Sequence, residues 1–232
     1  VTAIVLSAGK GSRFGYGIPK PLALIANKPV LAYSLLRLNS HPLIKEIILV
    51  VSHKNKAAIT RVLQKYKIVK LTKIVIGGKE RQDSLGNALS ALPLNTDIVV
   101  VHDGARPFID QHLTSKLIRE ADKNGAAVLG VPVKDTIKEI CSPQPKDQSA
   151  GIIKATLKRD KLWAVQTPQA FKKNIILEAY RRFGKVKVTD DSSLAEMMGI
   201  KVRVVSSSYS NIKITTRDDL ALAEVIAKRD CR

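Results

Sequence analysis

The sequence is poor in cysteine and has no long apolar run, and each shortage excludes a class of protein. Its two cysteines, Cys141 and Cys231, lie far apart and match no metal-binding spacing, so we expect neither a disulfide framework nor a cysteine metal site. The longest apolar run, residues 126–133, is far shorter than the roughly 18 residues that span a bilayer. We therefore expect a soluble cytoplasmic protein with no membrane partner. Because the chain begins at Val1 without a methionine, a plastid-type organelle stays open if a transit segment was removed.

Acidic residues are also scarce beside basic ones. The 20 Asp and Glu residues against 39 Lys and Arg residues give a formal net charge of +19, which raises nucleic-acid binding as an alternative function. However, the cations are scattered without a block of five or six, and an aromatic content of 4% is too low for a base-stacking platform. The composition favours a basic surface that attracts anionic small molecules, and we expect no specific nucleic-acid partner.

What the sequence does have is a regular alternation of apolar runs and amphipathic segments. This alternation predicts one α/β domain over residues 1–232, a three-layer Rossmann-like fold whose mostly parallel sheet binds ligands at the carboxyl ends of its strands. The predicted strands are residues 3–6, 46–52, 73–76, 97–101, 126–131, 163–166, 201–206 and 212–214. The predicted helices are residues 29–38, 54–66, 85–92, 110–124, 172–183, 190–198 and 216–227.

The alternation breaks between about residues 132 and 163. Two β-branched segments, residues 136–140 and 151–157, flank a stretch rich in Ser, Pro, Gln and Lys. We predict a hairpin that leaves the domain as a β-arm. The excursion is too long for a surface connection, and a lone hairpin could not bury its β-branched residues stably in water, so the arm needs a partner surface.

A glycine-rich loop, S-A-G-K-G-S-R-F…P-K-P, follows the first predicted strand. Gly9 and Gly11 lack a Cβ atom, which lets backbone N–H groups approach an anion closely. The loop matches neither G-x-x-x-x-G-K-[ST] nor G-x-G-x-x-G, because Phe14 stands where a third glycine belongs. It resembles instead the signature of nucleotidyltransferases that join a nucleoside triphosphate to a sugar or polyol phosphate. From the glycines alone, a flexible loop with solvated cations is an equal alternative.

A second motif, H-D-G-A-R-P, directly follows the predicted strand 97–101. At a strand's carboxyl end, Asp103 could hold Mg²⁺ against triphosphate oxygens, and Arg106 could form a bidentate pair with a phosphate. The alternative is that Asp103 and Arg106 only pair with each other at a turn. We interpret His102 as structural, because a phosphate nucleophile is already ionised at neutral pH and needs no general base. Trp163 and Tyr209 are interpreted as core or rim residues.

Further motifs follow in order: G-G-x-E-R-x-D-S, V-K-D-T, L-W-x-x-Q-T-P-Q, V-T-D-D and N-I-K-I-T. Together with the first two, and over residues 3–224, they resemble the 2-C-methyl-D-erythritol 4-phosphate cytidylyltransferase family. The resemblance implies a nucleotidyltransferase fold in which the substrate phosphate attacks the α-phosphorus of CTP with the help of Mg²⁺, and pyrophosphate leaves. It also implies a homodimer joined through the β-arm, in which Arg159 reaches the active site of the neighbouring subunit. The alternative is an intrachain flap that lets Arg159 reach its own site. A cytidylyltransferase for ribitol 5-phosphate is the alternative, since it shares several of these motifs.

The resemblance also implies roles for particular residues. It makes Arg13 and Lys20 the catalytic cations and Asp103 the metal ligand. The implied nucleotide-binding residues are Ser7, Ala8, Gly9, Lys10, Gly11, Ser12, Arg13, Lys20, Gly78, Ser84 and Asp103. The implied substrate-binding residues are Arg106, Thr136, Arg159, Thr167, Thr189 and Lys213. Lys213 lies between two isoleucines, and an ordinary solvated lysine is the alternative there.

Overall fold

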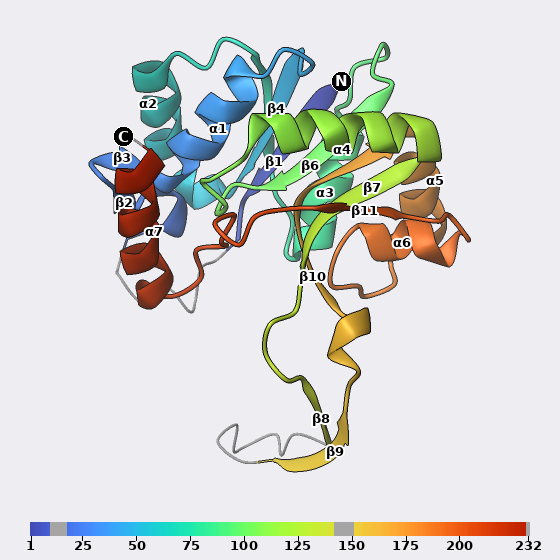
Figure 1. Ribbon diagram of the computed structural model, residues 1–232. Coiled ribbons are helices and arrows are strands. Elements are labelled where there is room, and N and C mark those ends of the chain that lie inside the picture. The colour runs from blue at the N-terminus through green and yellow to red at the C-terminus, as the bar shows by residue number, and fades with distance from the viewer. Residues whose placement is uncertain (10–17, 142–150, 231–232) are drawn as a thin grey trace.

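The computed structural model describes residues 1–9, 18–141 and 151–230, and Figure 1 shows their arrangement. Its strands are β1 (Thr2–Ser7), β2 (Leu24–Ile25), β3 (Lys28–Pro29), β4 (Glu46–Val51), β5 (Leu71–Ile76), β6 (Ile98–Asp103), β7 (Ala126–Pro132), β8 (Lys138–Cys141), β9 (Ile152–Thr156), β10 (Trp163–Lys172) and β11 (Arg203–Ser206). Its α-helices are α1 (Val30–Ser40), α2 (Lys56–Tyr66), α3 (Arg81–Leu89), α4 (Gln111–Asn124), α5 (Lys173–Phe183), α6 (Ser192–Met197) and α7 (Arg217–Asp230). Short 3-10 helices are η1 (Lys20–Leu22), η2 (His53–Asn55) and η3 (Arg159–Lys161).

The central sheet has seven strands in the order β11-β7-β10-β6-β1-β4-β5. The pairs β1–β4, β1–β6, β4–β5 and β7–β11 are parallel, which confirms the predicted mostly parallel sheet. Strand β10 differs, because it runs antiparallel to both of its neighbours, β6 and β7. It also extends to Lys172, well beyond the predicted strand 163–166.

Side chains of alternate residues in the strands divide the core into two layers. Ala3, Val5 and Val100 point to the face covered by α1, α2 and α4. Ile4 and Val101 point to the other face, which is covered by α3, α5 and α6. The near-continuous apolar strands of the sequence reflect this burial on both sides, as expected for a three-layer fold (Figure 1).

One predicted strand, residues 212–214, is wrong. The segment makes a backbone hydrogen bond from Ile214 to the carbonyl of Ala105, but it joins no strand ladder. Ile214 is nevertheless fully buried in a small cluster with Ile25 and Ala223. That cluster joins the β2–β3 hairpin to α7, and it holds the C-terminal segment beside the carboxyl ends of β1 and β6.

Strands β8 and β9 form an antiparallel pair, which confirms the predicted hairpin. Figure 1 shows this pair projecting from the body below β10. Its apolar side chains are open to solvent, with Ile152 77% and Ile153 56% exposed. In the described part of the chain, no helix is long and apolar enough to cross a membrane.

Candidate active site

A cavity of about 550 Å³ opens at the carboxyl ends of the three neighbouring parallel strands β1, β4 and β6. Ser7 ends β1, Ser52 follows β4 and Asp103 ends β6, and all three residues line the cavity. The parallel register brings these ends to one edge of the sheet, with Leu6 opposite Val50 on one side and Asp103 on the other. The fold thus places the cavity where parallel α/β sheets bind ligands.

The loop between β5 and α3 forms one wall of this cavity. A Cβ atom on Gly77 would lie 2.3 Å from that of Ala8, so only glycine lets the loop come so close to the end of β1. The Ser84 hydroxyl accepts a hydrogen bond from the Gly78 N–H at 3.1 Å and donates one to the Glu80 carbonyl at 3.0 Å. Helix α3 then begins with a capping box between Glu80 and Asp83. The Gly-Gly sequence and the Ser84 hydroxyl therefore shape this wall.

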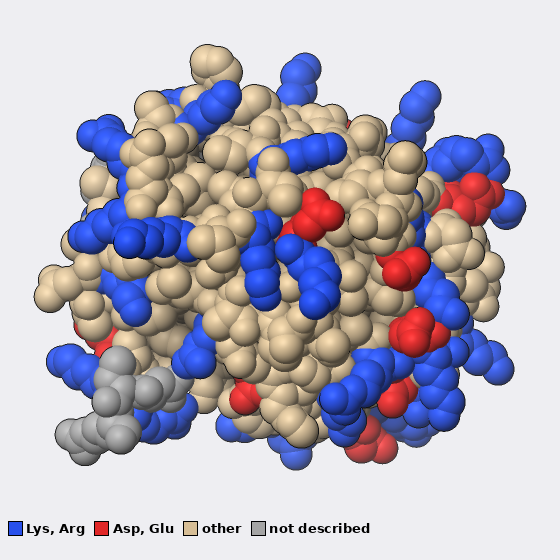
Figure 2. All heavy atoms as spheres, turned by 90° about the horizontal axis from the view of Figure 1, so that it is seen from above, with Lys and Arg blue, Asp and Glu red and all other residues tan. Residues whose placement is uncertain are grey.

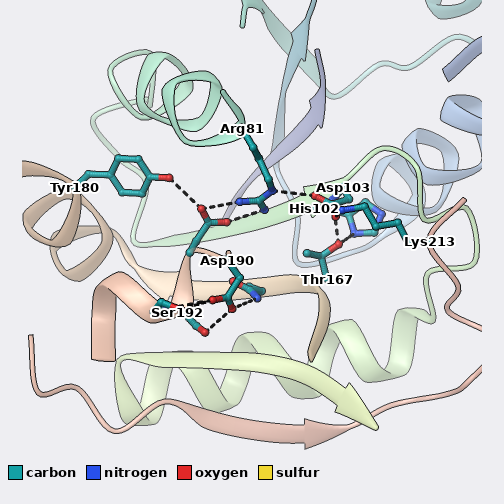
Figure 3. Close-up of polar contacts among 11 residues, drawn as sticks. Arg81, His102, Asp103, Thr167, Tyr180, Asp190, Ser192 and Lys213 are labelled. Carbon is teal, nitrogen blue, oxygen red and sulfur yellow. Dashed lines mark hydrogen bonds and ion pairs between the residues drawn. The ribbon is translucent and has the colours of Figure 1, made fainter. Parts of the chain in front are cut away.

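The carboxylate of Asp103 lines the cavity, although only 7% of the residue is exposed. Its Oδ2 lies 2.7 Å from Lys213 Nζ, and its Oδ1 lies 3.3 Å from Arg81 Nε (Figure 3). Burial would raise the pKa of the Asp103 carboxyl, but the charges of Arg81 and Lys213 outweigh burial and hold it far below its ordinary value. Asp103 is therefore ionised at neutral pH and faces two cations.

Sequence reasoning assigned no role to Arg81, which the structure brings to the centre of the site. Its two terminal nitrogens contact the carboxylate of Asp191, with Nη1–Oδ1 at 2.9 Å and Nη2–Oδ2 at 2.8 Å, and the Tyr180 hydroxyl donates to the same carboxylate at 3.0 Å. Asp191 is 1% exposed, so Arg81 links a buried carboxylate to Asp103 (Figure 3). Two of the sequence motifs contain these residues. Arg81 is the arginine of G-G-x-E-R-x-D-S, and Asp191 is the second aspartate of V-T-D-D.

His102 and Thr167 lie beneath the cavity. His102 is fully buried, and its Nε2 is 3.0 Å from the carbonyl oxygen of Arg106. Thr167 Oγ1 is 3.2 Å from His102 Nδ1 and accepts the backbone N–H of Asp103 at 3.0 Å. Both side chains thus contact the Asp103–Arg106 segment from the side away from the cavity.

Arg106 reaches toward the C-terminal segment, where its Nη1 donates to the carbonyl of Asn211 at 2.7 Å. Burial lowers the pKa of the Arg106 guanidinium, although Asp103 opposes this effect. Its Nε is buried and has no hydrogen-bond partner among the described residues. Arg106 and Asp103 therefore do not pair at a turn through their side chains as the alternative interpretation of this motif supposed.

The structure brings together part of the predicted site. The predicted residues that line the cavity are Ser7, Ala8, Gly9, Lys20, Gly78, Ser84, Asp103 and Lys213. Those that lie elsewhere are Arg106, Thr136, Arg159, Thr167 and Thr189. Lys10, Gly11, Ser12 and Arg13 lie outside the described residues. Lining residues that the sequence reasoning did not single out include Ser52, Lys79, Arg81 and Thr215.

Two of the residues that do not line the cavity, Thr136 and Arg159, belong to the β-arm. Arg159 begins η3 on the β-arm, where its Nη1 donates to the Lys134 carbonyl at 2.6 Å (Figure 1). Thr136 is exposed in the segment that joins β7 to β8. Neither residue lines the cavity of its own chain.

The buried histidine predicts a pH dependence of stability. Burial lowers the pKa of His102 from 6.5 to about 4, so the unfolded state binds the proton more readily and the folded state loses stability as the pH falls from about 6.5 to about 4. The loss amounts to about 3 kcal/mol at the acid end of this window. Urea unfolding across this pH range, without divalent cations, should show a steeper decline for the wild type than for His102→Asn.

Two comparisons make this test specific. Burial also lowers the pKa of His41, which adds the same slope to both proteins, so the difference between the two curves isolates His102. The exposed His112 supplies the matched control, and His112→Asn should keep the wild-type slope. Parallel curves for the wild type and His102→Asn would contradict the prediction.

The charged residues on the face seen in Figure 2 do not form a continuous basic stripe that a nucleic acid could follow. On the face seen in Figure 2, Lys and Arg side chains are spread over most of the outline and are not gathered into one stripe. By contrast, the cavity concentrates the cations Lys20, Lys79, Arg81 and Lys213 around Asp103 and Glu80. This distribution suits a small polyanion such as a triphosphate.

A three-layer α/β fold with a basic cavity at the ends of β1, β4 and β6, and an ionised aspartate at its centre, defines a nucleotidyltransferase. Residues 1–229 match the family model described as 2-C-methyl-D-erythritol 4-phosphate cytidylyltransferase. The chain belongs to this family.

Relatives and solved structures agree with this assignment. The chain is 45% identical to the 2-C-methyl-D-erythritol 4-phosphate cytidylyltransferase of Syntrophus aciditrophicus, over 99% of this chain and 97% of the relative. It is 44% identical to that of Clostridium tetani, over 98% and 90%. The crystal structure of 4-diphosphocytidyl-2C-methyl-D-erythritol synthase from Anaerococcus prevotii is 34% identical, with a TM-score of 0.83 over 98% of this chain and 96% of that one. Neither ribitol phosphate transfer nor nucleic-acid binding is favoured.

Proposed function

We propose that the protein transfers the cytidylyl group of CTP to 2-C-methyl-D-erythritol 4-phosphate, giving 4-diphosphocytidyl-2-C-methyl-D-erythritol and pyrophosphate. The observation that carries this proposal is Asp103, ionised at the cavity floor between Arg81 and Lys213. Such transfer has little covalent chemistry for side chains to perform and depends on positioning and charge stabilisation. A cavity with four cations and one central carboxylate meets that need.

We propose further that the triphosphate lies along the end of β1. Ser7 supports this position, because its hydroxyl is buried in the cavity wall without a hydrogen-bond partner among the described residues. Lys20 lines the same cavity and stabilises the negative charge that builds up on the α-phosphate, together with Arg13. Gly78 and Ser84 on the opposite wall hold the cytosine and ribose.

Asp103 is the residue that would hold a divalent cation. Mg²⁺ binds proteins through one or two carboxylates and takes its other ligands from water and substrate phosphates, so a single ionised aspartate beside a triphosphate site fits it. When bound, the ion would neutralise charge on the phosphate oxygens. Lys213 now contacts Asp103 Oδ2 at 2.7 Å, and it can turn from that oxygen toward the second substrate's phosphate.

The substrate phosphate is already ionised and attacks without a general base. Arg106, Lys213 and Thr189 are proposed to hold methylerythritol phosphate from the chain's own body. Thr136 and Arg159 are proposed to act from the β-arm of a second subunit. The chain is thus one nucleotidyltransferase domain whose arm, about residues 132–163, joins two subunits about a two-fold axis.

The exposed apolar residues of the arm support this dimer. Ile140, Ile152, Ile153 and Leu157 are between 37% and 77% exposed in the single chain. A two-stranded sheet of this kind is marginally stable in water on its own, and burial against an identical arm would cover these side chains. The arm of each subunit would then place Arg159 at the cavity of the other subunit.

A direct assay tests the reaction. The protein is incubated with CTP, Mg²⁺ and either methylerythritol phosphate or ribitol 5-phosphate, and pyrophosphate release is followed. We expect turnover with methylerythritol phosphate. Preference for ribitol 5-phosphate, or salt-sensitive nucleic-acid binding without turnover, would contradict the proposal.

The same assay predicts selectivity for CTP. We propose that backbone groups of the glycine loop and of residues 77–84 enforce the choice of nucleotide, so we expect CTP to have a kcat/KM at least about a hundredfold above that of UTP or ATP. No single side chain of these loops should decide this preference alone. Equal use of UTP or ATP would contradict the proposal that these two loops recognise cytosine.

A further inference from the structure

Thr167 occupies an unusual place for a residue that the sequence resemblance assigns to substrate binding. It is 5% exposed and does not line the cavity. Its hydroxyl is engaged on both sides, by the Asp103 backbone N–H at 3.0 Å and by His102 Nδ1 at 3.2 Å. Figure 3 shows Thr167 directed at the Asp103 and His102 end of strand β6. Its hydroxyl therefore faces the protein.

The direction of each hydrogen bond in the series from Asp103 through Thr167 and His102 to Arg106 follows from which terminal groups can only donate or only accept. The Asp103 N–H can only donate, so it leaves the Thr167 hydroxyl hydrogen for His102 Nδ1. The Arg106 carbonyl can only accept, so His102 Nε2 carries its hydrogen. One neutral tautomer of His102, protonated on Nε2, satisfies all three contacts. These three hydrogen bonds thus form an ordered relay from Asp103 through Thr167 and His102 to Arg106.

The relay fixes the two ends of the turn that carries the site's acid and its arginine. The Arg106 N–H donates to the Asp103 carbonyl at 2.9 Å, which closes the turn. Ser34 Oγ donates to the same Arg106 carbonyl at 3.0 Å. With Thr167 holding the Asp103 N–H and His102 holding the Arg106 carbonyl, neither end can shift without breaking a buried hydrogen bond.

We propose that Thr167 and His102 are positioning residues, which set the carboxylate of Asp103 for the nucleotide. Thr167 then acts on Mg·CTP through Asp103, not on methylerythritol phosphate by contact. This inference rests on the role proposed above for Asp103. The Thr167 hydroxyl is buried and gives its single hydrogen to His102, so it has none left to donate to a substrate phosphate.

Calorimetric titration of CTP with Mg²⁺, in the absence of methylerythritol phosphate, separates the two roles of Thr167. Thr167→Val keeps the shape of the side chain and removes the hydroxyl. We expect about tenfold weaker Mg·CTP binding and a comparable fall in kcat, because an unpaired Asp103 N–H lets the acid shift. Thr167→Ser retains the hydroxyl and should restore binding to near the wild-type value, and the KM for methylerythritol phosphate should stay within about twofold in both variants.

Thr2→Val is the matched control. Thr2 is equally buried, and its hydroxyl bonds that of Thr96 at 2.8 Å at the amino end of β1, away from the cavity. We expect this variant to lower the melting temperature as much as Thr167→Val does but to leave Mg·CTP binding unchanged. Equal loss of binding in both variants would reduce Thr167 to a general stabilising role and overturn the proposal.

The relay also predicts coupling between its members. His102→Asn breaks the contact with the Arg106 carbonyl and loosens the turn that begins at Asp103, so it should weaken Mg·CTP binding. The double variant should be no weaker than the worse single one. If Thr167→Val fails to fold, the titration of His102→Asn with Mg·CTP tests the proposal in its place.

Unchanged Mg·CTP binding with a raised KM for methylerythritol phosphate would show a direct substrate contact instead. Absence of CTP binding in the wild type would contradict the proposed function itself, which keeps the two failures distinct.

Discussion

The variant Lys20→Ala is expected to lose at least about a hundredfold in kcat while it remains folded. Lys20 lines the cavity at the start of η1, on the side of β1 where the triphosphate is proposed to lie. Removing a cation that acts where negative charge builds up affects the transition state more than the bound nucleotide. We therefore expect a fall in kcat that exceeds any rise in the Mg·CTP dissociation constant, measured by pyrophosphate release and calorimetry.

The control for this variant is Lys45→Ala. Lys45 is exposed, and its backbone N–H bonds the Val1 carbonyl at the amino end of β1, away from the cavity. Its replacement should leave kcat unchanged. Thermal unfolding must accompany the assay because Lys20 also serves the fold. Burial would raise the pKa of Asp219, but hydrogen bonds from Thr216 and Thr215 and the charge of Lys20 hold it below its ordinary value.

Arg13 is predicted to act with Lys20 but lies outside the described residues. Arg13→Ala should show the same pattern of a large fall in kcat with little change in folding. Unchanged turnover in both the Arg13 and the Lys20 variants would reject a phosphate-binding role for the loop that follows β1.

Mixing two inactive variants is expected to regain activity. Arg159→Ala removes the cation of the arm, and Lys20→Ala removes the cation of the cavity. If the arm serves the neighbouring subunit, a heterodimer of the two variants contains one intact composite site and one doubly altered site. Random exchange of equal amounts should then reach about a quarter of the wild-type activity, starting from two preparations with almost none.

The structure supplies the reason to expect this result. Arg159 contacts the Lys134 carbonyl on its own arm at 2.6 Å, and η3 lies outside the cavity formed by its own body. Native mass spectrometry must confirm that heterodimers form. Heterodimers without activity would exclude a shared site, and a monomeric protein with full activity would exclude the dimer altogether.

The sequence predicted the framework of the fold from local signals. Strands β1, β4, β6 and β7 are apolar runs that are buried on both faces. Such runs can be predicted from the local sequence, without knowing which strands pair with them. The helices between them have apolar faces at helical spacing. Boundaries were less certain, and residues 212–214 were wrongly assigned because alternating isoleucines in a packed segment resemble a strand that has no ladder partner.

The antiparallel course of β10 could not be predicted from local pattern. Its buried half, Gln166–Phe171, contains two glutamines, a threonine and a proline, which is a weak strand pattern. These residues are in the sheet because β10 lies between β6 and β7 and pairs with both. Thr167 consequently lies beside Asp103, a neighbour 64 positions away in the sequence.

For the candidate site, the sequence by itself determined which chemical groups are present: a glycine loop with cations after β1, an aspartate at the end of β6, and lysines and arginines suited to phosphates. Motif position carries this information because the end of a strand can be predicted from the residues around it. Only the tertiary structure decided that Arg81 joins Asp103 to the buried Asp191, and that Thr167 supports Asp103 from below. These contacts join residues 22 to 110 positions apart. Their partners are set by strand order and sheet register, which no single segment of the chain encodes.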